Sequence, residues 1–400
     1  MRRLLGTVAL LTFGLLWTAC GGGGSGGSSP KPPPPLSGAN VLPISVNDHA
    51  FGFAEIPYVT VTVCSPITSA CQQIPNVLVD TGSFGLRIFS QALQTPLAQQ
   101  TDGANNLIAE CFPFVSDNTW GPIQYANVKL GGEPAVTMPI QVINAGFSTV
   151  PASCTNSNVV LRTPPQAGFN GILGVGTSAV DCGAGCAQIA ATNVYFSCTA
   201  AGPSGVCSPV TQPIESQVVN PAVVLPADNN GVFIRLPSIG TNGAQQASGS
   251  LVFGIGTEAN NGLRNAHVFR IDPVTGNFTV QFNGQTLSES FIDSGSNGLF
   301  FPDSSIPQCS ADAGFYCPPQ TLNFQATNEG LNGETGIVKF NIANFHNLLA
   351  TGHAAFNDIG GAEVGGGIFD WGLPFFFGRS VYFAINGAHT PGGPGPYYAY

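Results

Sequence analysis

The chain has few charged residues: Asp, Glu, Lys and Arg together make up 8% of its 400 residues. Its 11 basic residues are outnumbered by 21 acidic ones, which gives a formal net charge of −10 at pH 7. No basic patch is available to neutralise phosphates, so nucleic acid is excluded as an expected partner.

Two kinds of enzyme centre also lack the residues they need. The five His are scattered, and no Cys/His group has the spacing of zinc ligands, so we expect no metal site and no cofactor. A serine hydrolase would need a Gly-x-Ser-x-Gly elbow, whereas Ser83 and Ser296 stand in Gly-Ser-x-Gly sequences with no His nearby. Covalent labelling by a fluorophosphonate would be evidence for a serine hydrolase.

Glycine (52 residues) and proline (32 residues) are abundant, and Val, Thr and Phe are frequent. This composition is typical of strands and turns rather than surface helices. Apolar and polar residues alternate from Tyr58 to Val63, as in a half-buried strand. We therefore expect an all-β protein, long enough for two domains.

The N-terminus has the pattern of an export signal. Two arginines, Arg2 and Arg3, precede an apolar stretch from Leu4 to Trp17 that is too short for a comfortable membrane span. The sequence Thr18-Ala19-Cys20 resembles the cleavage box of bacterial lipoproteins, in which the cysteine is lipidated and becomes the mature N-terminus. We predict a signal peptide over 1–19 and lipidation of Cys20, with simple secretion as the alternative.

Residues 20–40 are predicted to be a tether. The stretch Gly21–Pro35 is Gly/Ser-rich and then Pro-rich, so it is first flexible and then extended, and it cannot bury a core. Together with lipidation, it predicts a folded domain held at the bacterial cell envelope, in the periplasm or at the outer membrane.

One motif occurs twice. Val77-Leu-Val-Asp80-Thr-Gly-Ser-Phe-Gly-Leu86 and Phe291-Ile-Asp293-Ser-Gly-Ser-Asn-Gly-Leu299 both read as an apolar run followed by Asp-(Thr/Ser)-Gly-Ser-x-Gly-Leu. The apolar run predicts a buried strand and the glycines predict a tight turn. Each copy therefore holds one carboxylate at the end of a strand. The alternative is that each motif is only a polar turn.

Two carboxylates forced together share one proton, because both cannot ionise at once. Such a pair acts as base and acid in the same step. The ionised partner takes a proton from a water between them, and the protonated partner donates to the carbonyl oxygen that the water attacks. The Ser83 and Ser296 hydroxyls can donate to the carboxylates, and those of Thr81 and Ser294 can tie the two turns together.

The paired motif resembles that of the pepsin-like aspartic proteases, a family whose carboxylate dyad is a standard case of proton sharing. The resemblance implies a bilobal fold with related β-barrel-like lobes, which we place at 41–228 and 229–400 with the cleft between them. It implies a peptide or protein substrate, and we expect a monomer. It makes Asp80 and Asp293 the catalytic pair. The residues of the surrounding loops are then Thr81, Gly82, Ser83, Ser294, Gly295 and Ser296.

The same resemblance places other segments. The stretch 120–132 resembles the strand after the substrate-covering flap, so Phe112, Phe114 and Trp120 are the candidate flap aromatics. The stretches Gly171–Gly176 and Gly365–Phe383 resemble the strands that pass behind the first and second Asp turns. The Gly/Pro-rich tail, Ala388–Tyr400, is expected to be loosely held.

The cysteines predict an oxidising compartment. There are eleven, and ten remain once Cys20 is set aside. Nearest-neighbour pairing predicts Cys64–Cys71, Cys111–Cys154, Cys182–Cys186, Cys198–Cys207 and Cys309–Cys317, although the sequence leaves the connectivity open.

Two functions compete. The intact Asp pair predicts an aspartic endopeptidase without metal or cofactor. The absence of a flap tyrosine and of a basic propeptide instead favours a catalytically inactive module with a binding or structural role at the cell envelope.

Overall fold

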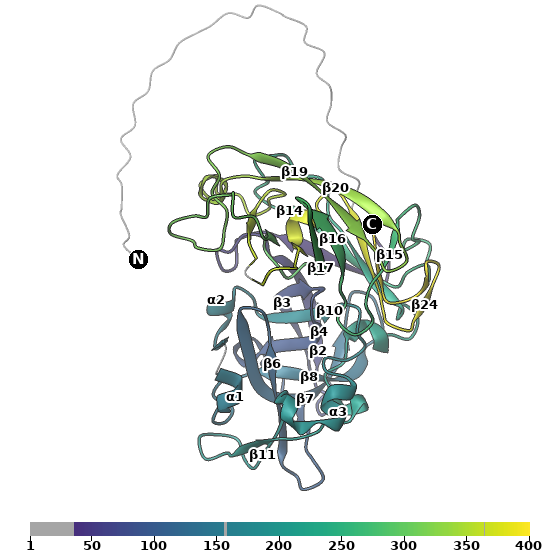
Figure 1. The fold of residues 1–400 in the computed structure, drawn as a ribbon. Coiled ribbons are helices and arrows are strands. Elements are labelled where there is room, and N and C mark those ends of the chain that lie inside the picture. The colour runs from purple at the N-terminus through teal and green to yellow at the C-terminus, as the bar shows by residue number, and fades with distance from the viewer. Residues whose placement is uncertain (1–35, 156–157, 364) are drawn as a thin grey trace, which may run out of the picture. The chain divides into compact units, whose positions relative to one another are not determined.

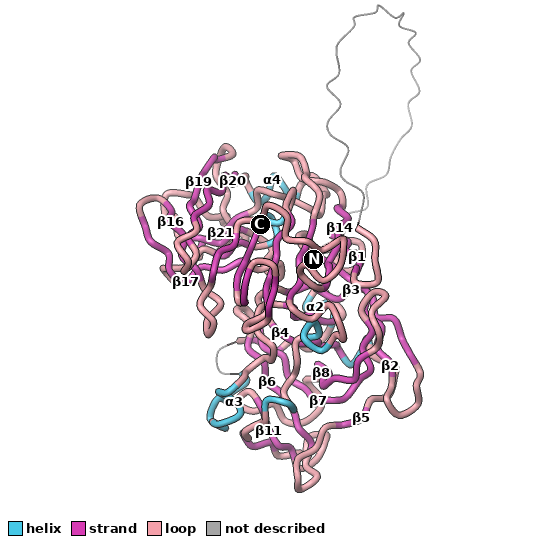
Figure 2. The backbone as a smooth tube through the Cα atoms, turned by 90° about the vertical axis from the view of Figure 1, so that its right-hand side faces the viewer, coloured by secondary structure: helices cyan, strands magenta, loops and turns pink. Residues whose placement is uncertain are grey.

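The computed structural model describes residues 36–400 except 156, 157 and 364. The predicted signal peptide (1–19), the lipidation site Cys20 and the tether up to residue 35 lie outside the described residues. The described part belongs to one compact unit. Its helices are few and short (Figure 2), so the predicted all-β class is confirmed.

The described strands form two large sheets and one small sheet. The 17-stranded sheet comprises β1 (Val41–Val46), β2 (Pro57–Cys64), β3 (Cys71–Asp80), β4 (Phe84–Phe89), β5 (Ala98–Gln99), β6 (Leu107–Pro113), β7 (Asp117–Lys129), β8 (Val136–Ile143), β9 (Val159–Val160), β10 (Gly171–Val175), β11 (Tyr195–Cys198), β12 (Cys207–Pro209), β13 (Gly231–Arg235), β14 (Ala247–Phe253), β15 (Val268–Arg270), β23 (Ser380–Ala384) and β26 (Tyr397–Ala399). The seven-stranded sheet comprises β16 (Phe278–Phe282), β17 (Gln285–Ile292), β18 (Leu299–Phe301), β19 (Leu322–Glu329), β20 (Thr335–Ile342), β21 (Gly360–Ala362) and β22 (Asp370–Trp371).

The small sheet pairs β24 (His389–Thr390) with β25 (Gly393–Pro394). The helical segments that the structure describes are α1 (Ala152–Thr155), α2 (Pro164–Ala167), α3 (Ala184–Gln188) and α4 (Phe345–Leu349), with 3-10 turns at Ser90–Ala92, Ala190–Thr192, Ile214–Ser216, Pro221–Val224 and Leu373–Phe376.

Six strands of the larger sheet make a nearly closed barrel (Figure 1). β3 pairs with β2 and β10, β10 pairs with β4, β4 pairs with β8, and β7 links β8 back to β2. Inward residues such as Val61, Val79 and Ile140 are less than 1% exposed. The alternation around Tyr58–Val63 thus produces a strand with one face in the barrel core.

The two motif copies have the same strand arrangement. β3, which ends at Asp80, runs parallel to β10, and β4 after the turn pairs antiparallel with β10. β17 precedes Asp293 and runs parallel to β22, and β18 after the turn pairs antiparallel with β22. Each Asp turn therefore sits where three strands meet, as we expected for Gly171–Gly176 and Gly365–Phe383.

Strands from both ends of the chain share the larger sheet. β1 pairs along its length with β14, with Val41 opposite Val252, and β13 pairs with β23. The N-terminal strand thus joins residues on the far side of the predicted lobe boundary. The division after residue 228 stays a prediction.

Five disulfides connect the ten cysteines that the structure describes, and they are the five predicted pairs. The long Cys111–Cys154 link is among them, with an S–S distance of 2.03 Å. This number of disulfides indicates an exported protein. In the described ranges, no helix has the length and apolar character to cross a membrane.

The prediction of a loose C-terminal tail is wrong. β26 pairs with both β15 and β23, and Tyr397, Tyr398 and Ala399 are at most 4% exposed. Buried aromatic rings and two strand ladders outweigh the effect of the glycines and prolines before them.

Candidate active site

The two Asp turns lie against each other. The backbone N–H of Ser294 donates to the Thr81 hydroxyl (2.8 Å), and the Ser294 hydroxyl donates to the Val79 carbonyl (2.7 Å). All these groups are buried, so these hydrogen bonds join the two copies of the motif firmly.

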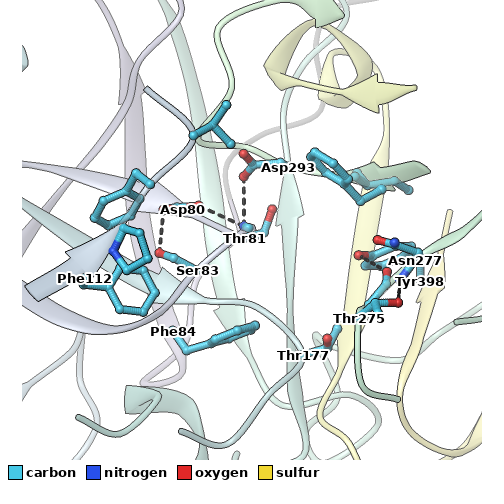
Figure 3. A pocket seen from close by; sticks show the side chains of 17 residues that line it. Asp80, Thr81, Ser83, Phe84, Phe112, Thr177, Thr275, Asn277, Asp293 and Tyr398 are labelled. Carbon is cyan, nitrogen blue, oxygen red and sulfur yellow. Dashed lines mark hydrogen bonds between the residues drawn. The ribbon is translucent and has the colours of Figure 1, made fainter. Parts of the chain in front are cut away.

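The carboxylates of Asp80 and Asp293 meet at a shared donor (Figure 3). The Gly82 N–H donates to Asp80 Oδ1 (2.8 Å) and to Asp293 Oδ1 (2.9 Å). The other oxygen of each carboxylate, Oδ2, accepts a hydrogen bond from a serine of the same turn. Ser83 donates to Asp80 Oδ2 at 2.5 Å, and Ser296 donates to Asp293 Oδ2 at 2.9 Å. The carboxylates are therefore held at a fixed orientation by groups from both turns.

Glycine is required at the two positions that face the carboxylates. A Cβ added to Gly82 would lie 2.7 Å from the Asp293 Cγ, and one added to Gly295 would lie 2.8 Å from Asp80 Oδ1. Both distances are too short for a side chain. The glycines after each Asp thus allow the opposite turn to approach.

Burial raises the pKa of Asp80 to about 8, and the nearby charge of Asp293 acts in the same direction. Hydrogen bonds from Ser83 and Gly82 oppose this shift without cancelling it. Asp80 is 5% exposed. A raised pKa on one carboxyl of a close pair is what proton sharing requires, and the sharing itself stays a prediction of the motif pattern.

These raised pKa values predict that the protein loses stability as the pH rises. Burial also raises the pKa of Asp358, to about 6. The unfolded chain releases these protons near pH 4, whereas the folded chain retains them up to about pH 6 and pH 8. The unfolding temperature should therefore fall between pH 4 and pH 8.

Thermal unfolding followed across that range checks this expectation. The half-buried carboxylate Asp102 has a lowered pKa of about 2, so the stability that it adds is gained mostly below about pH 4, where the unfolded chain ionises, and it opposes the trend little. Asp80→Asn should flatten the pH dependence. A melting temperature that rises steadily from pH 4 to pH 8 would contradict the assignment.

Two cavities flank the carboxylates, and both Asp80 and Asp293 line each of them. The first has a volume of about 300 Å³, and its other lining side chains include Phe84, Phe112, Thr177, Asn277, Phe291 and Tyr398 (Figure 3). The second has a volume of about 380 Å³, and its lining residues include Phe53, Ile56, Leu78, Phe114, Leu161, Phe169 and Ile172. The pair therefore sits between two largely apolar recesses.

The hairpin of β6 and β7 covers this region. Phe112 lines the first cavity and Phe114 lines both, while Val115 at the tip is 95% exposed. Trp120 is not a flap residue: it is fully buried and packs against Phe196, with ring centroids 5.4 Å apart. It pairs with Cys111 across the hairpin, so it points to the face opposite Phe112.

A buried ion network lies behind the hairpin. Arg87 donates to Glu110 (2.8 Å) and to Asp181 (3.1 Å), and none of the three side chains is exposed. The Arg87 guanidinium carbon is 3.8 Å from the centroid of the Phe112 ring. Burial, followed by the charge of Glu110, raises the pKa of Asp181 well above its ordinary range. These contacts link the base of the hairpin to the first Asp turn.

Sequence reasoning missed several residues of the site. Arg87, Phe84 and Phe291 stand within or beside the motif copies, so proximity to the motif was a usable signal. Tyr398 comes from the far end of the chain, and no local pattern indicates that it lines a cavity with Asp293.

Comparison with known proteins finds a matching protein family. Residues 37–400 match a family model described as "Protein of unknown function (DUF3443)". No curated protein matches the chain.

Proposed function

The chain belongs to the DUF3443 family, and we propose that it is an aspartic endopeptidase with a pepsin-like arrangement of two Asp turns. The observation that carries the proposal is the Gly82 N–H, which donates to one carboxylate oxygen of each Asp. A single donor at 2.8 and 2.9 Å places both carboxylates within reach of one water molecule.

The reaction follows from the shared proton. Asp293 takes a proton from the water, whose oxygen attacks the peptide carbonyl carbon. Asp80 gives its proton to the carbonyl oxygen, which produces a neutral tetrahedral diol. In the second step Asp293 returns its proton to the amide nitrogen, the C–N bond breaks, and a diol hydroxyl returns a proton to Asp80.

The alkaline limit of this reaction follows from the pKa of Asp80. Above about pH 8 Asp80 loses the proton it donates, so activity should be confined to acidic and neutral pH. A rate that keeps rising above pH 9 would exclude Asp80 as the acid.

The cavities indicate the substrate class. Their side chains are mostly aromatic and aliphatic, and apart from the Asp pair the carboxylate they offer is that of Asp117. Peptides with apolar side chains on both sides of the cleaved bond fit these linings best. A preference for Lys or Arg beside the cleaved bond would contradict this assignment.

A peptide library tests the proposal. The purified protein is incubated with the library from pH 3 to pH 8, with and without a peptide whose secondary alcohol mimics the tetrahedral diol, and products are read by mass spectrometry. We expect cleavage between apolar residues that the mimic suppresses. Peptide capture without products would favour the alternative, an inactive binding or structural module, and inhibition by a fluorophosphonate would favour a serine hydrolase.

One specific observation favours the alternative function, an inactive binding or structural module. At the place where the hairpin covers the cavity, Phe112 and Phe114 offer no hydrogen-bond donor. A module that only binds peptides would not need one.

Phe112 provides a prediction about the hairpin. Replacing it by Leu keeps apolar volume but removes the ring face from Arg87, a contact of about 0.5–2 kcal/mol. If this contact is made only when the hairpin closes, kcat/KM should fall by about 2- to 30-fold. Phe112→Tyr keeps the ring and should stay near wild type in the same steady-state assay. Equal rates for the Leu and wild-type proteins would show that the contact does not serve catalysis.

We also propose that Cys20 carries a lipid that anchors the protein to the cell envelope. The lipoprotein-like sequence at Thr18–Cys20 supports this, and the disulfides support export. The mass of the mature N-terminus checks it, since an unmodified N-terminus at another residue would exclude lipidation.

A further inference from the structure

A group of metal-ligand side chains lies outside the lining of the two cavities. Among the described residues, Cys309, Cys317 and His346 form the one group of three whose ligand atoms all lie within 4.8 Å of one another. In this structure the two sulfurs are joined in a disulfide. The sequence spacing does not indicate the group, because the cysteines are eight positions apart and the histidine follows on a different element.

The backbone of the hairpin 307–317 brings the two cysteines together. The Cys309 N–H donates to the Phe315 carbonyl (2.9 Å), and the Cys317 N–H donates to the Pro307 carbonyl (2.7 Å). Neither hydrogen bond involves a sulfur atom, so neither depends on the S–S bond. Two free thiols at these positions would therefore still face each other across the hairpin.

His346 is held against the same hairpin. It lies on α4, where the neighbouring Phe345 ring stacks on Phe315 with centroids 4.1 Å apart, and the Phe345 N–H donates to the Tyr316 carbonyl (3.2 Å). His346 Nε2 lies 2.7 Å from Asp312 Oδ2, in the hairpin. Because an ionised carboxylate only accepts, this contact places the ring hydrogen on Nε2 and leaves Nδ1 as the nitrogen with a lone pair for a metal.

The donor set of this group favours zinc. Two thiolates and an imidazole are ligands of Zn²⁺ rather than of hard cations such as Mg²⁺ or Ca²⁺. In a tetrahedral zinc site the ligand atoms lie about 3.5–3.8 Å apart, given the usual Zn–S and Zn–N bond lengths. The three atoms here already lie within 4.8 Å, so small side-chain movements complete the site once the S–S bond is open. His346 is 44% exposed, which gives an ion and a fourth, water ligand access from solvent.

We propose that this hairpin is a zinc site in the reduced chain: the thiolates of Cys309 and Cys317 and the imidazole of His346 bind Zn²⁺, and formation of the disulfide releases the ion. Zinc binding displaces two protons from the thiols. A disulfide oxidant then accepts two electrons from the thiolates and two protons from water and leaves as two thiols, while the Cys309–Cys317 bond closes and Zn²⁺ is released. The reduced form exists wherever the compartment keeps cysteines as thiols.

A metal titration tests the site. The purified protein is reduced under native conditions by a phosphine, which becomes its oxide with oxygen from water as each S–S bond becomes two thiols. Added Co²⁺ should give the absorption of tetrahedral, thiolate-bound cobalt, and Zn²⁺ should displace it. His346→Ala should weaken Zn²⁺ binding by at least about 10-fold, since the loss of even an outer-shell partner costs that much.

His267→Ala is the matched control for this titration. His267 is also an exposed histidine paired with a carboxylate, that of Glu334 at 2.6 Å, and it does not belong to the group with the cysteines. This variant should bind Zn²⁺ as tightly as wild type. Absence of thiolate-bound cobalt in the reduced wild type, or an affinity that His346→Ala leaves unchanged, would overturn the proposal.

A second measurement needs no variant, because the Cys64–Cys71 disulfide serves as an internal control. Its cysteines are seven positions apart, against eight for Cys309 and Cys317, and the described residues place no third metal ligand beside them. The reduced protein is reoxidised by a small-molecule disulfide with and without Zn²⁺, free thiols are trapped by alkylation, and the pairs are read by mass spectrometry. Zn²⁺ should slow the closure of Cys309–Cys317 by about 10-fold or more and leave that of Cys64–Cys71 unchanged.

An equal effect of Zn²⁺ on the two disulfides, or no effect on either, would exclude a zinc site at Cys309 and Cys317. The zinc site does not rest on the peptidase function, because neither measurement uses a peptide substrate.

Discussion

Replacing either Asp80 or Asp293 by Asn should reduce peptide hydrolysis by about 10²–10⁴-fold, because the pair then lacks either its base or its acid. Asparagine has nearly the same shape, and its amide oxygen can still accept from Gly82, which donates to both side chains. The loss should therefore appear in kcat, measured on a peptide found in the library.

Two controls separate chemistry from folding. Asp312→Asn changes a half-exposed carboxylate that pairs with His346, and its activity should match wild type. Because the pKa of Asp80 is raised, Asp80→Asn should not lower the unfolding temperature at pH 7. Undiminished hydrolysis in both Asn variants of the pair would mean that other residues carry the reaction.

The largest effect on stability is expected from Arg87→Met. Arg87 is the cation that faces both Glu110 and Asp181, and all three side chains are fully buried. Removing it leaves buried acids without their counter-charge, a loss of about 3–5 kcal/mol in the free energy of unfolding at pH 7. Urea denaturation measures this, with the exposed Arg162→Met as the matched control at about 0.5 kcal/mol or less.

The same variant should recover part of its stability in acid. Burial and the charge of Glu110 raise the pKa of Asp181, so lower pH supplies the proton that neutralises the uncompensated pair. The difference between wild type and Arg87→Met should therefore be smaller at pH 5 than at pH 7. A loss below about 1 kcal/mol at pH 7 would mean that the network contributes little to the fold.

The parts of the site that were predictable from sequence are those encoded in short segments. Asp80 and Asp293 each end an apolar strand and precede glycines, and that local pattern places a carboxylate on a tight turn wherever the strand lies. The disulfides were predictable for a similar reason, since four of the five close loops of nine residues or fewer.

The parts that were not predictable depend on register and on distant partners. Trp120 was grouped with Phe112 because both are aromatic and near the hairpin tip, but their side chains take opposite faces once Cys111 is paired with Trp120. Asp370 looks like any polar residue in a Gly-rich stretch until the parallel pairing with Phe291 places it on the strand beside the second Asp turn. The place of Tyr398 in the site depends on the pairing of the last strand, β26, with β15 and β23, which no local sequence pattern predicts.

One measurement tests the central claim most directly: a crystal structure of the protein with a peptide whose secondary alcohol replaces the carbonyl of the cleaved bond. We expect that hydroxyl to lie between Asp80 and Asp293, within hydrogen-bond distance of both. The side chains of the peptide should occupy the two flanking cavities. A peptide bound elsewhere, or carboxylates too far apart to contact one hydroxyl, would contradict the account.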